Sequence, residues 1–358
     1  MSIGRPSRLI PLVLVSMAAG SLAAAAPKLE PLSGGPPHPP ENPPTQAKIR
    51  LGEELFFDSI LSGGRRRNCG TCHKRELHFM DGLSRAWGLD ESELTRKTPG
   101  LLNVGWQRSI FFDGRVKTLE EQVSKPLENH REMDLDPDEA VRRIRGDRYY
   151  SRLFSEAFPG EEITFRLVAK AVASFERTLV SYDSDLDRYL LGQEDALSQA
   201  AKRGMDLFTG RAQCIRCHNG PLLTDHDFHF TGVLERDGHG KAGDKYKTQS
   251  LRDVLRRYSY MHNGRMMTIR QVIEHYDRGG SAPEGLQAEI KPLGLTDAEK
   301  DDLVAFLRAL NGRVHRVPDT FPEGPGQLAD TAAPEAVPSS SDSGESGAAV
   351  DDPSYLNR

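Results

Sequence analysis

The chain has few cysteines, few tryptophans and almost no long hydrophobic run. Its 358 residues include 4 cysteines and 2 tryptophans. All four cysteines lie in two short motifs, so none is left over for a structural disulfide. After residue 26 no apolar stretch is long enough to cross a bilayer. The sequence therefore excludes a disulfide-stabilised scaffold and predicts no stable membrane span in the mature protein.

The chain also lacks an excess of positive charge. Its net charge is -5, but eight acids and one base lie from Val317 to the C-terminus. Arg5 and Arg8 add two positive charges at the other end, so the stretch between balances at zero. Without a basic field, a nucleic-acid partner is excluded. Residues 317–358 are rich in Pro, Ser, Gly and Ala, which predicts a disordered acidic tail.

The first 44 residues have the composition of a targeting segment and a linker. Arg5 and Arg8 precede an apolar run from Leu9, and small residues continue to Ala26. This order predicts a secretory signal peptide over residues 1–26, and hence export to the periplasm. An uncleaved anchor is the alternative, because the run is just long enough to span, but the alanine-rich end favours cleavage. Residues 27–44 are Pro-rich and predict an extended lead-in.

Two copies of Cys-x-x-Cys-His are the most informative feature of the sequence. They are Cys69–His73 and Cys214–His218. In this motif two thiols attach a c-type haem, and the following imidazole binds the iron. We therefore predict two covalent haems c, held by Cys69, Cys72, Cys214 and Cys217, with His73 and His218 as iron ligands. The alternative is one zinc site made by all four thiolates, which leaves both histidines unexplained.

The hydrophobic pattern predicts an all-α protein. Apolar residues recur at helical spacing over 45–57, 164–179, 184–190, 195–208, 267–276 and 296–310, with further helices opening at Asp136 and Asp147. Alternation of Val, Ile and Thr is scarce, and residues 219–248 read as a loop. Because 145 residues separate Cys69 from Cys214, we expect one haem per domain. The prediction is two tandem cytochrome c-like domains, over residues 45–182 and 183–316.

Several further motifs, in matching order, resemble the bacterial di-haem cytochrome c peroxidases and their MauG relatives. The resemblance extends over about residues 46–312, and its motifs are Leu51–Asp58, Cys69–His73, Phe112–Gln122, Cys214–His218 and Tyr260–Gly264. It implies that the first haem reacts with peroxide and that the second transfers electrons. His73 and His218 would be the proximal ligands of these two irons.

The resemblance also implies an acid–base group near the first iron. In the family a Gln, followed ten residues later by a Glu, lines the pocket where peroxide binds, and Gln122 and Glu132 have that spacing with Pro126 between them. Glu132 would move the proton and Gln122 would be its hydrogen-bonding partner. Taken without the resemblance, Glu132 reads as a solvated surface residue.

The family loop that often carries a distal histidine is Met80–Asp90 here, and it contains no histidine. His78 lies too close to the haem motif to match the family position. The resemblance therefore implies a first haem that is permanently open on one side, as in MauG.

The second iron has two kinds of candidate sixth ligand. Methionine is a usual ligand of electron-transfer haems, and Met261, Met266 and Met267 all lie downstream of His218. The family position, fourteen residues after His262, is Tyr276, where classical peroxidases have Met and MauG has Tyr. We favour Tyr276, with a core tyrosine and a methionine ligand as the alternative.

Two departures from the family bear on function. Phe112 stands where a tryptophan usually relays electrons between the haems, and Trp106 is the nearest replacement. The family's calcium-binding positions correspond to Lys97, Arg257 and Ser259. Two cations in that place make calcium doubtful.

The sequence is compatible with three functions. The first is a MauG-type enzyme that uses hydrogen peroxide to oxidise a protein side chain, with tryptophan favoured, through a high-valent haem. The second is a classical cytochrome c peroxidase, which takes electrons from a small c-type cytochrome or cupredoxin. The third is a di-haem electron carrier without enzymatic activity. The missing distal histidine and Tyr276 favour the first.

Overall fold

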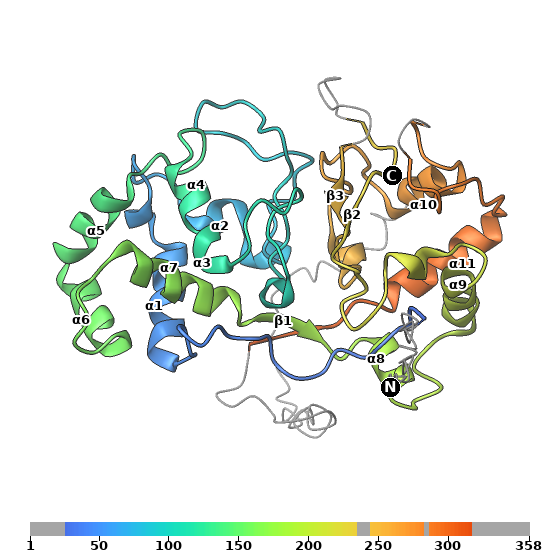
Figure 1. Ribbon diagram of the computed structural model, residues 1–358, viewed down its shortest axis with the longest axis horizontal. Helices are drawn as coiled ribbons and strands as arrows, with labels where there is room; N and C mark the ends of the chain where they lie inside the picture. The colour runs from blue at the N-terminus through green and yellow to red at the C-terminus, as the bar shows by residue number, and fades with distance from the viewer. Residues whose placement is uncertain (1–25, 235–243, 283–285, 317–358) are drawn as a thin grey trace, which may run out of the picture.

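The computed structural model describes residues 26–234, 244–282 and 286–316. The predicted signal peptide up to residue 25 and the predicted acidic tail lie outside these residues. The described chain forms two halves, each around its own hydrophobic core (Figure 1). The first core draws on residues from Leu51 to Leu179 and the second on residues from Leu186 to Leu310. Within the described residues, no helix has the length and apolar character needed to cross a membrane.

The N-terminal half is built from helices, as predicted. They are α1 Gln46–Phe57, α2 Cys69–Cys72, α3 Leu119–Gln122, α4 Ser124–Glu128, α5 Pro137–Arg145, α6 Arg148–Ala157 and α7 Phe165–Glu176, with short 3-10 turns η1 Ser59–Leu61, η2 Arg75–Leu77 and η3 Val104–Trp106. Thr45 caps α1 by accepting a hydrogen bond from the Lys48 amide. Helix α1 packs on α7 so closely that a Cβ on Gly52 would lie 1.9 Å from the Ala171 carbonyl oxygen.

The C-terminal half repeats this kind of packing with other helices. They are α8 Asp185–Leu190, α9 Gln199–Thr209, α10 Ile269–Asp277 and α11 Asp297–Arg308, with 3-10 turns η4 Cys214–Arg216 and η5 Val254–Arg256. Gly204 of α9 faces the Asp302 carbonyl oxygen of α11, where a Cβ would lie 2.0 Å away. The stretch predicted as a loop contains a small sheet of β2 Phe228–His229 and β3 Tyr246–Lys247.

A second small sheet joins the two halves. Strand β1 Leu179–Tyr182 pairs antiparallel with β4 Arg313–Arg316, near the C-terminal end of the described chain (Figure 1). The predicted helix over 164–179 therefore ends early, at Glu176, because the chain leaves it to enter β1. The prediction of a mainly helical protein is confirmed, with two two-stranded sheets in the described residues.

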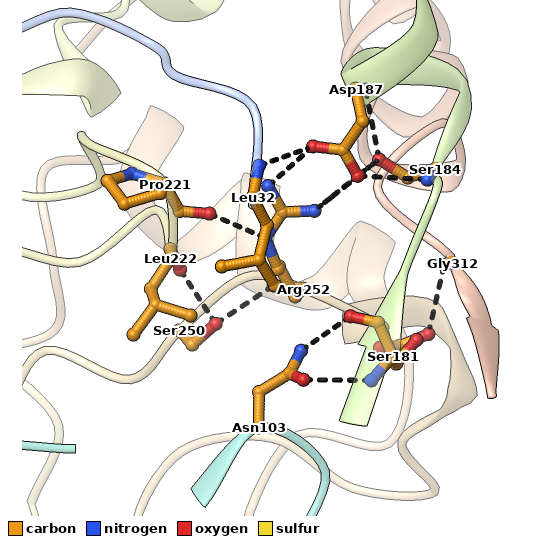
Figure 2. Close-up of polar contacts among 11 residues, drawn as sticks. Leu32, Asn103, Ser181, Ser184, Asp187, Pro221, Leu222, Ser250, Arg252 and Gly312 are labelled. Carbon is orange, nitrogen blue, oxygen red and sulfur yellow. Dashed lines mark hydrogen bonds and ion pairs between the residues drawn. The ribbon is translucent and has the colours of Figure 1, made fainter. Parts of the chain in front are cut away.

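The Pro-rich lead-in is ordered along both halves. Leu29 pairs with Gly220 in the C-terminal half, and the Leu32 amide donates to Asp187 Oδ1 at 2.9 Å. Asp187 in turn forms a buried ion pair with Arg252, at 2.7 and 2.8 Å (Figure 2). In the N-terminal half, Asn42 Nδ2 donates to Glu120 Oε1 at 2.9 Å. The lead-in therefore acts as a strap across both halves.

The two halves contain one local fold twice, at an offset of 150 positions. Asn103 and Asp253 both adopt the left-handed conformation, with φ of 60° and 55°, and the same holds for Gly114 and Gly264. The bridge between Ile110 and Val116 recurs between Tyr260 and Met266, and Thr118 and Thr268 both cap the helix that follows. The hydrophobic pattern alone does not reveal this repeat. Its signal is identity at this offset, at Leu101, Val104, Ser109, Gly114, Arg115 and Thr118.

The repeat also organises the boundary between the halves. Lys97 Nζ donates to the Ser259 carbonyl, and Lys247 Nζ donates to the Ser109 carbonyl. Lys97 is equivalent to Lys247 in the repeat, and Ser109 is equivalent to Ser259. Each half therefore donates from its lysine to the equivalent serine carbonyl of the other half. Arg96 and Tyr246, also equivalent, meet each other, with Arg96 Nη2 3.1 Å from the Tyr246 hydroxyl. The halves therefore face each other about an approximate two-fold axis.

Candidate haem sites

The first Cys-x-x-Cys-His motif forms one short helical turn. Helix α2 carries Cys69 and Cys72, and His73 follows it directly. Asn68 and Thr71 make a capping box that fixes the start of the turn. The His73 Nδ1 atom lies 3.0 Å from the Phe79 carbonyl oxygen, which fits an Nδ1–H donor. That tautomer leaves Nε2 available for a metal.

The second motif has the same arrangement. Cys214 begins η4, Cys217 closes it, and His218 Nδ1 lies 3.0 Å from the Leu223 carbonyl oxygen. Burial lowers the pKa of His218 to about 4, so the imidazole is neutral at physiological pH. A neutral imidazole with its Nδ1 committed to a carbonyl is suited to bind iron through Nε2.

The thiols fit haem attachment better than zinc binding. Cys69 and Cys72 belong to the first half and Cys214 and Cys217 to the second, and all four are free. In the described residues one group of possible metal ligands comes within 4.8 Å, and it contains a single thiol, with Cys217, Asp225 and His229. The alternative of one zinc site made by four thiolates is therefore wrong. Burial also raises the pKa of each thiol, to about 12 for Cys69 and Cys214.

A cavity of about 280 Å³ lies beside the second motif. Its wall includes Cys214, Cys217 and His218, together with Tyr276 of α10. Most of its lining is apolar, as expected for a pocket that binds a porphyrin. The residues around this cavity therefore fit a haem.

Two of the candidate sixth ligands reach this cavity. Tyr276 and Met261 both line it, whereas Met267 is 50% exposed and Met266 is not among the lining residues. Burial raises the pKa of the Tyr276 phenol, and the nearby Cys214 and Cys217 thiols act in the same direction. A hydrogen bond with Thr231 acts in the opposite direction. Of the four candidates, Tyr276 and Met261 are therefore the two that lie at this cavity.

The first half has a different residue at the position of Tyr276. Subtracting the repeat offset of 150 from Tyr276 gives Pro126. The single helix α10 corresponds to the pair α3 and α4, which is broken at Val123. Proline lacks the amide hydrogen that would bond the Gln122 carbonyl, which accounts for the break. Pro126 has no atom that could bind a metal.

Glu132 lies near the first motif, but its hydrogen-bond partner differs from our expectation. Asn129 Nδ2 donates to Glu132 Oε1 at 2.6 Å. No hydrogen bond joins Gln122 to Glu132 among the described residues, so the expected contact is replaced by a closer donor on the same loop. Burial raises the pKa of Glu132, against the effects of Asn129 and of Arg115 and Arg67. The pKa of the Cys72 thiol is raised by burial first, then by the Asp81 charge, and to a smaller extent by the Glu132 charge.

The loop Met80–Asp90 contains no histidine that could bind the first iron. His78, just ahead of it, lies at the boundary between the halves, where its Nδ1 is 3.3 Å from Arg256 Nη1.

The aromatic residues between the two motifs include no buried tryptophan. Phe112 is buried and lines the cavity of the second half. Trp106 is partly buried in η3, and Trp87 is 48% exposed. Tyr246 also lines the cavity, and its ring stacks on His262 with a centroid distance of 3.7 Å.

The positions that resemble the family's calcium site are occupied by a lysine and an arginine. Lys97 is buried and donates to the carbonyl of Ser259, and Arg257 donates to the carbonyl of Ser250. Burial, with the nearby Arg257 guanidinium, lowers the pKa of Lys97 to about 7. Backbone carbonyls that could bind calcium are therefore already engaged by side-chain donors.

Comparison with known proteins identifies the family. The model of the di-haem cytochrome c peroxidase family matches residues 46–195. The methylamine utilization protein MauG of Methylorubrum extorquens is 40% identical over 300 residues, which cover 81% of this chain and 84% of that protein. The cytochrome c551 peroxidase of Nitrosomonas europaea is 29% identical over 321 residues, which cover 85% of this chain and 92% of that protein.

Solved structures agree with these relatives. The crystal structure of a MauG-like protein associated with microbial copper homeostasis matches with a TM-score of 0.72 and 32% identity, covering 78% of this chain and 93% of that one. The diheme peroxidase BthA from Burkholderia thailandensis shares the fold, with a TM-score of 0.65 and 22% identity over 80% of this chain and 94% of that one. The two Cys-x-x-Cys-His turns and these relationships together show that this chain belongs to the di-haem cytochrome c peroxidase family and is a haem-dependent oxidoreductase that uses peroxide.

Proposed function

We propose that this protein is a MauG-type enzyme, which uses hydrogen peroxide to oxidise a side chain of a partner protein, with tryptophan as the favoured target. Two haems c would be attached through Cys69 and Cys72 and through Cys214 and Cys217. His73 and His218 would bind the two irons, and Tyr276 would be the sixth ligand of the second. Export to the periplasm through the predicted signal peptide fits covalent haem attachment.

The observation that carries this proposal is the difference between two equivalent positions. Tyr276 can reach the cavity of the second half, whereas the first half has Pro126 at that position. The loop Met80–Asp90 also contains no histidine that could replace it. This asymmetry supports one haem that is open to peroxide and one that is closed by a phenol oxygen. The higher identity to MauG than to the cytochrome c551 peroxidase, 40% against 29%, points the same way.

The bound haems would supply the redox chemistry, and the protein would control the protons. Reduction of one hydrogen peroxide to two waters consumes two electrons and two protons, and the partner side chain provides the electrons. Glu132 would take the proton from the incoming peroxide and return it to the departing oxygen, so that the O–O bond breaks heterolytically. The hydrogen bond from Asn129 holds Glu132 Oε1 in place. Gln122 would orient the peroxide from α3.

The sixth ligand of the second haem would determine whether that haem stores an oxidising equivalent or accepts electrons. A phenol oxygen favours ferric over ferrous iron, and methionine has the opposite effect. Tyr276 therefore suits storage of an oxidising equivalent, and a methionine ligand would suit uptake of electrons from a small cytochrome.

A classical cytochrome c peroxidase is the second candidate, and Phe112 is the observation in its favour. A phenylalanine between the halves cannot be oxidised at an accessible potential, so it cannot relay a hole from one haem to the other. An enzyme that is reduced back to its resting state by a small redox protein depends less on hole transfer between the two haems. For either function, Lys97 and Arg257 occupy the calcium positions, so we expect no calcium there.

Electron paramagnetic resonance of the oxidised holoprotein tests the proposal. We expect one high-spin and one low-spin ferric centre, and loss of both signals after one equivalent of peroxide without prior reduction. Two low-spin centres, or no change until a reductant is added, would contradict it. Rapid steady-state turnover with reduced cytochrome c would favour the classical peroxidase.

A further inference from the structure

One buried acid beside the first motif has no role in the chemistry described above. Glu176 is the last residue of α7 and is 4% exposed. Its Oε2 atom is buried without a hydrogen-bond partner. Carboxyl groups are almost never fully buried unless they are paired, so a buried carboxyl oxygen without a partner calls for an explanation.

The nearest cation is already engaged. Arg177 donates to Glu120, from Nη1 to Oε1 at 2.7 Å and from Nη2 to Oε2 at 3.0 Å. The effects of these two residues on Glu176 oppose each other, since Arg177 favours the carboxylate and Glu120 disfavours it. Burial dominates and raises the pKa of Glu176 to about 8.

Glu176 lies beside the first Cys-x-x-Cys-His turn. After burial, its charge is the largest influence on the pKa of the Cys69 thiol. The preceding residue, Phe175, packs against Phe56 with a centroid distance of 5.2 Å, and Phe56 lies 6.3 Å from the His73 ring. The pKa of His73 responds to Asp81 and to the Phe79 carbonyl. A Cβ on Gly70, between Cys69 and Cys72, would lie 2.5 Å from the Phe57 ring, and Phe57 packs on Phe175 with a centroid distance of 6.0 Å, so the end of α7 lies next to this turn.

The other groups that face Glu176 have little freedom to titrate. Arg177 and Glu120 form a closed ion pair. The Cys69 thiol would be consumed by haem attachment, and α1 contributes the apolar rings of Phe56 and Phe57. His38 of the lead-in responds to Arg177 and Glu120.

We propose that Glu176 is a redox-linked proton site of the first haem, which binds a proton when that haem gains an electron and releases it when the electron is lost. The inference rests on the proposed function only in requiring a haem at Cys69 and Cys72. Oxidation of a bound haem adds one positive charge near the carboxyl, and a nearby positive charge favours the carboxylate. Reduction of the ferric haem by a one-electron donor, such as a small redox protein or a chemical titrant, therefore takes up one proton from solvent, and transfer of that electron to a one-electron acceptor returns the proton to solvent. This coupling lets the site change charge without leaving an uncompensated buried charge.

The coupling has a measurable consequence for the midpoint potential. When one proton accompanies one electron, the potential falls as pH rises, by up to about 59 mV for each tenfold change in proton concentration. The slope is confined to the range between the two pKa values of Glu176, the lower one in the oxidised protein and the higher one in the reduced protein. Outside this range the potential of the first haem is flat.

Redox titration of the holoprotein at pH values on both sides of 8 tests the inference. We expect a sloping potential for the first haem of the wild type. In Glu176→Gln the slope is lost, and at high pH the potential lies above that of the wild type, because the amide mimics the protonated acid. The second haem, in its separate core, keeps its own pH profile in both proteins. Glu161→Gln, an exposed acid just before α7, is the matched control and behaves as the wild type. An unchanged slope in Glu176→Gln would overturn the inference.

A second measurement, on the wild type, tests the inference without relying on the folding of Glu176→Gln. Redox-difference infrared spectra of the wild type should show a protonated carboxyl band that appears on reduction of the first haem and shifts in D2O and in Glu176→Asp. Absence of this band would also overturn the inference. A protein whose Cys69–His73 peptide carries no haem by mass spectrometry would instead contradict the proposed cofactor, so the two failures are distinguishable.

Discussion

Lys97 and Lys247 make the same contact in opposite directions across the boundary between the two halves. Lys97 donates to the carbonyl of Ser259, and Lys247 donates to the carbonyl of Ser109. The two lysines are 8% and 5% exposed. A buried ammonium is costly unless acceptors surround it, so these contacts make one placement of the halves more favourable than its alternatives.

Replacing Lys97 with methionine should destabilise the protein. The Lys97→Met side chain fills similar space but leaves the buried Ser259 carbonyl without a donor, which costs about 1–3 kcal/mol. Chemical denaturation would measure the free energy of unfolding. Lys125→Met changes an exposed lysine in the same half and should stay within about 0.5 kcal/mol of the wild type. Equal stability of Lys97→Met and Lys125→Met would show that the reciprocal contact contributes nothing.

Removal of calcium should have no effect on this protein. Lys97 and Arg257 occupy the positions where a divalent ion would bind, and their donors already engage backbone carbonyls. We expect the same melting temperature and the same haem absorption spectrum with and without a chelator. Elemental analysis that finds one calcium per chain would show this expectation to be wrong.

Glu132→Gln should slow the reaction with peroxide by at least about tenfold, the low end of what a positioned acid–base group contributes. Both haems should remain attached, because Glu132 makes its one described hydrogen bond with Asn129. Stopped-flow absorption would measure the rate. Glu128→Gln, an exposed acid on α4, is the matched control and should react as the wild type does. A Glu132→Gln protein with the normal rate would rule out this residue as the acid–base group.

The pH profile of the same reaction gives an independent check. Burial raises the pKa of Glu132 above its ordinary value. Because the carboxylate is the form that accepts the proton of peroxide, the rate should fall as pH drops through this raised pKa. In Glu132→Gln the rate should be independent of pH over the same range. A profile that is identical in both proteins would assign the titration to another group.

Tyr276→Phe should open the second haem. The phenol oxygen is lost while the ring still fills the cavity, so the low-spin ferric signal should be replaced by a second high-spin signal. Tyr260→Phe changes another tyrosine that lines the same cavity and should leave the spectrum as it is. A low-spin signal that persists in Tyr276→Phe would show that Tyr276 is not the ligand and make Met261, which lines the same cavity, the next candidate.

The parts of this protein that could be predicted from sequence are those with local signals. Thr45 before an amphipathic run predicts α1, and each Cys-x-x-Cys-His motif predicts its own turn. The parts that could not be predicted depend on distant residues coming together. No local pattern pairs Lys97 with Ser259, and the end of α7 is decided by pairing of β1 with the distant β4. From the sequence, Gln122 is the expected partner of Glu132, but the donor Asn129 becomes evident only when the loop is folded.

Pro126 offers the most direct test of the difference between the two halves. Its equivalent in the repeat is Tyr276, so a side chain with a ligand atom at position 126 should point towards the first haem. Pro126→Met should convert the high-spin signal of that haem to a low-spin one and slow the reaction with peroxide by more than about tenfold, because the reactive face is then closed. Lys125→Met puts the same side chain one position earlier, where residue 125 is exposed, and should change neither the spectrum nor the rate. If Pro126→Met keeps a high-spin first haem with normal reactivity, the equivalence of Pro126 and Tyr276 does not extend to the iron, and the open site must have another cause.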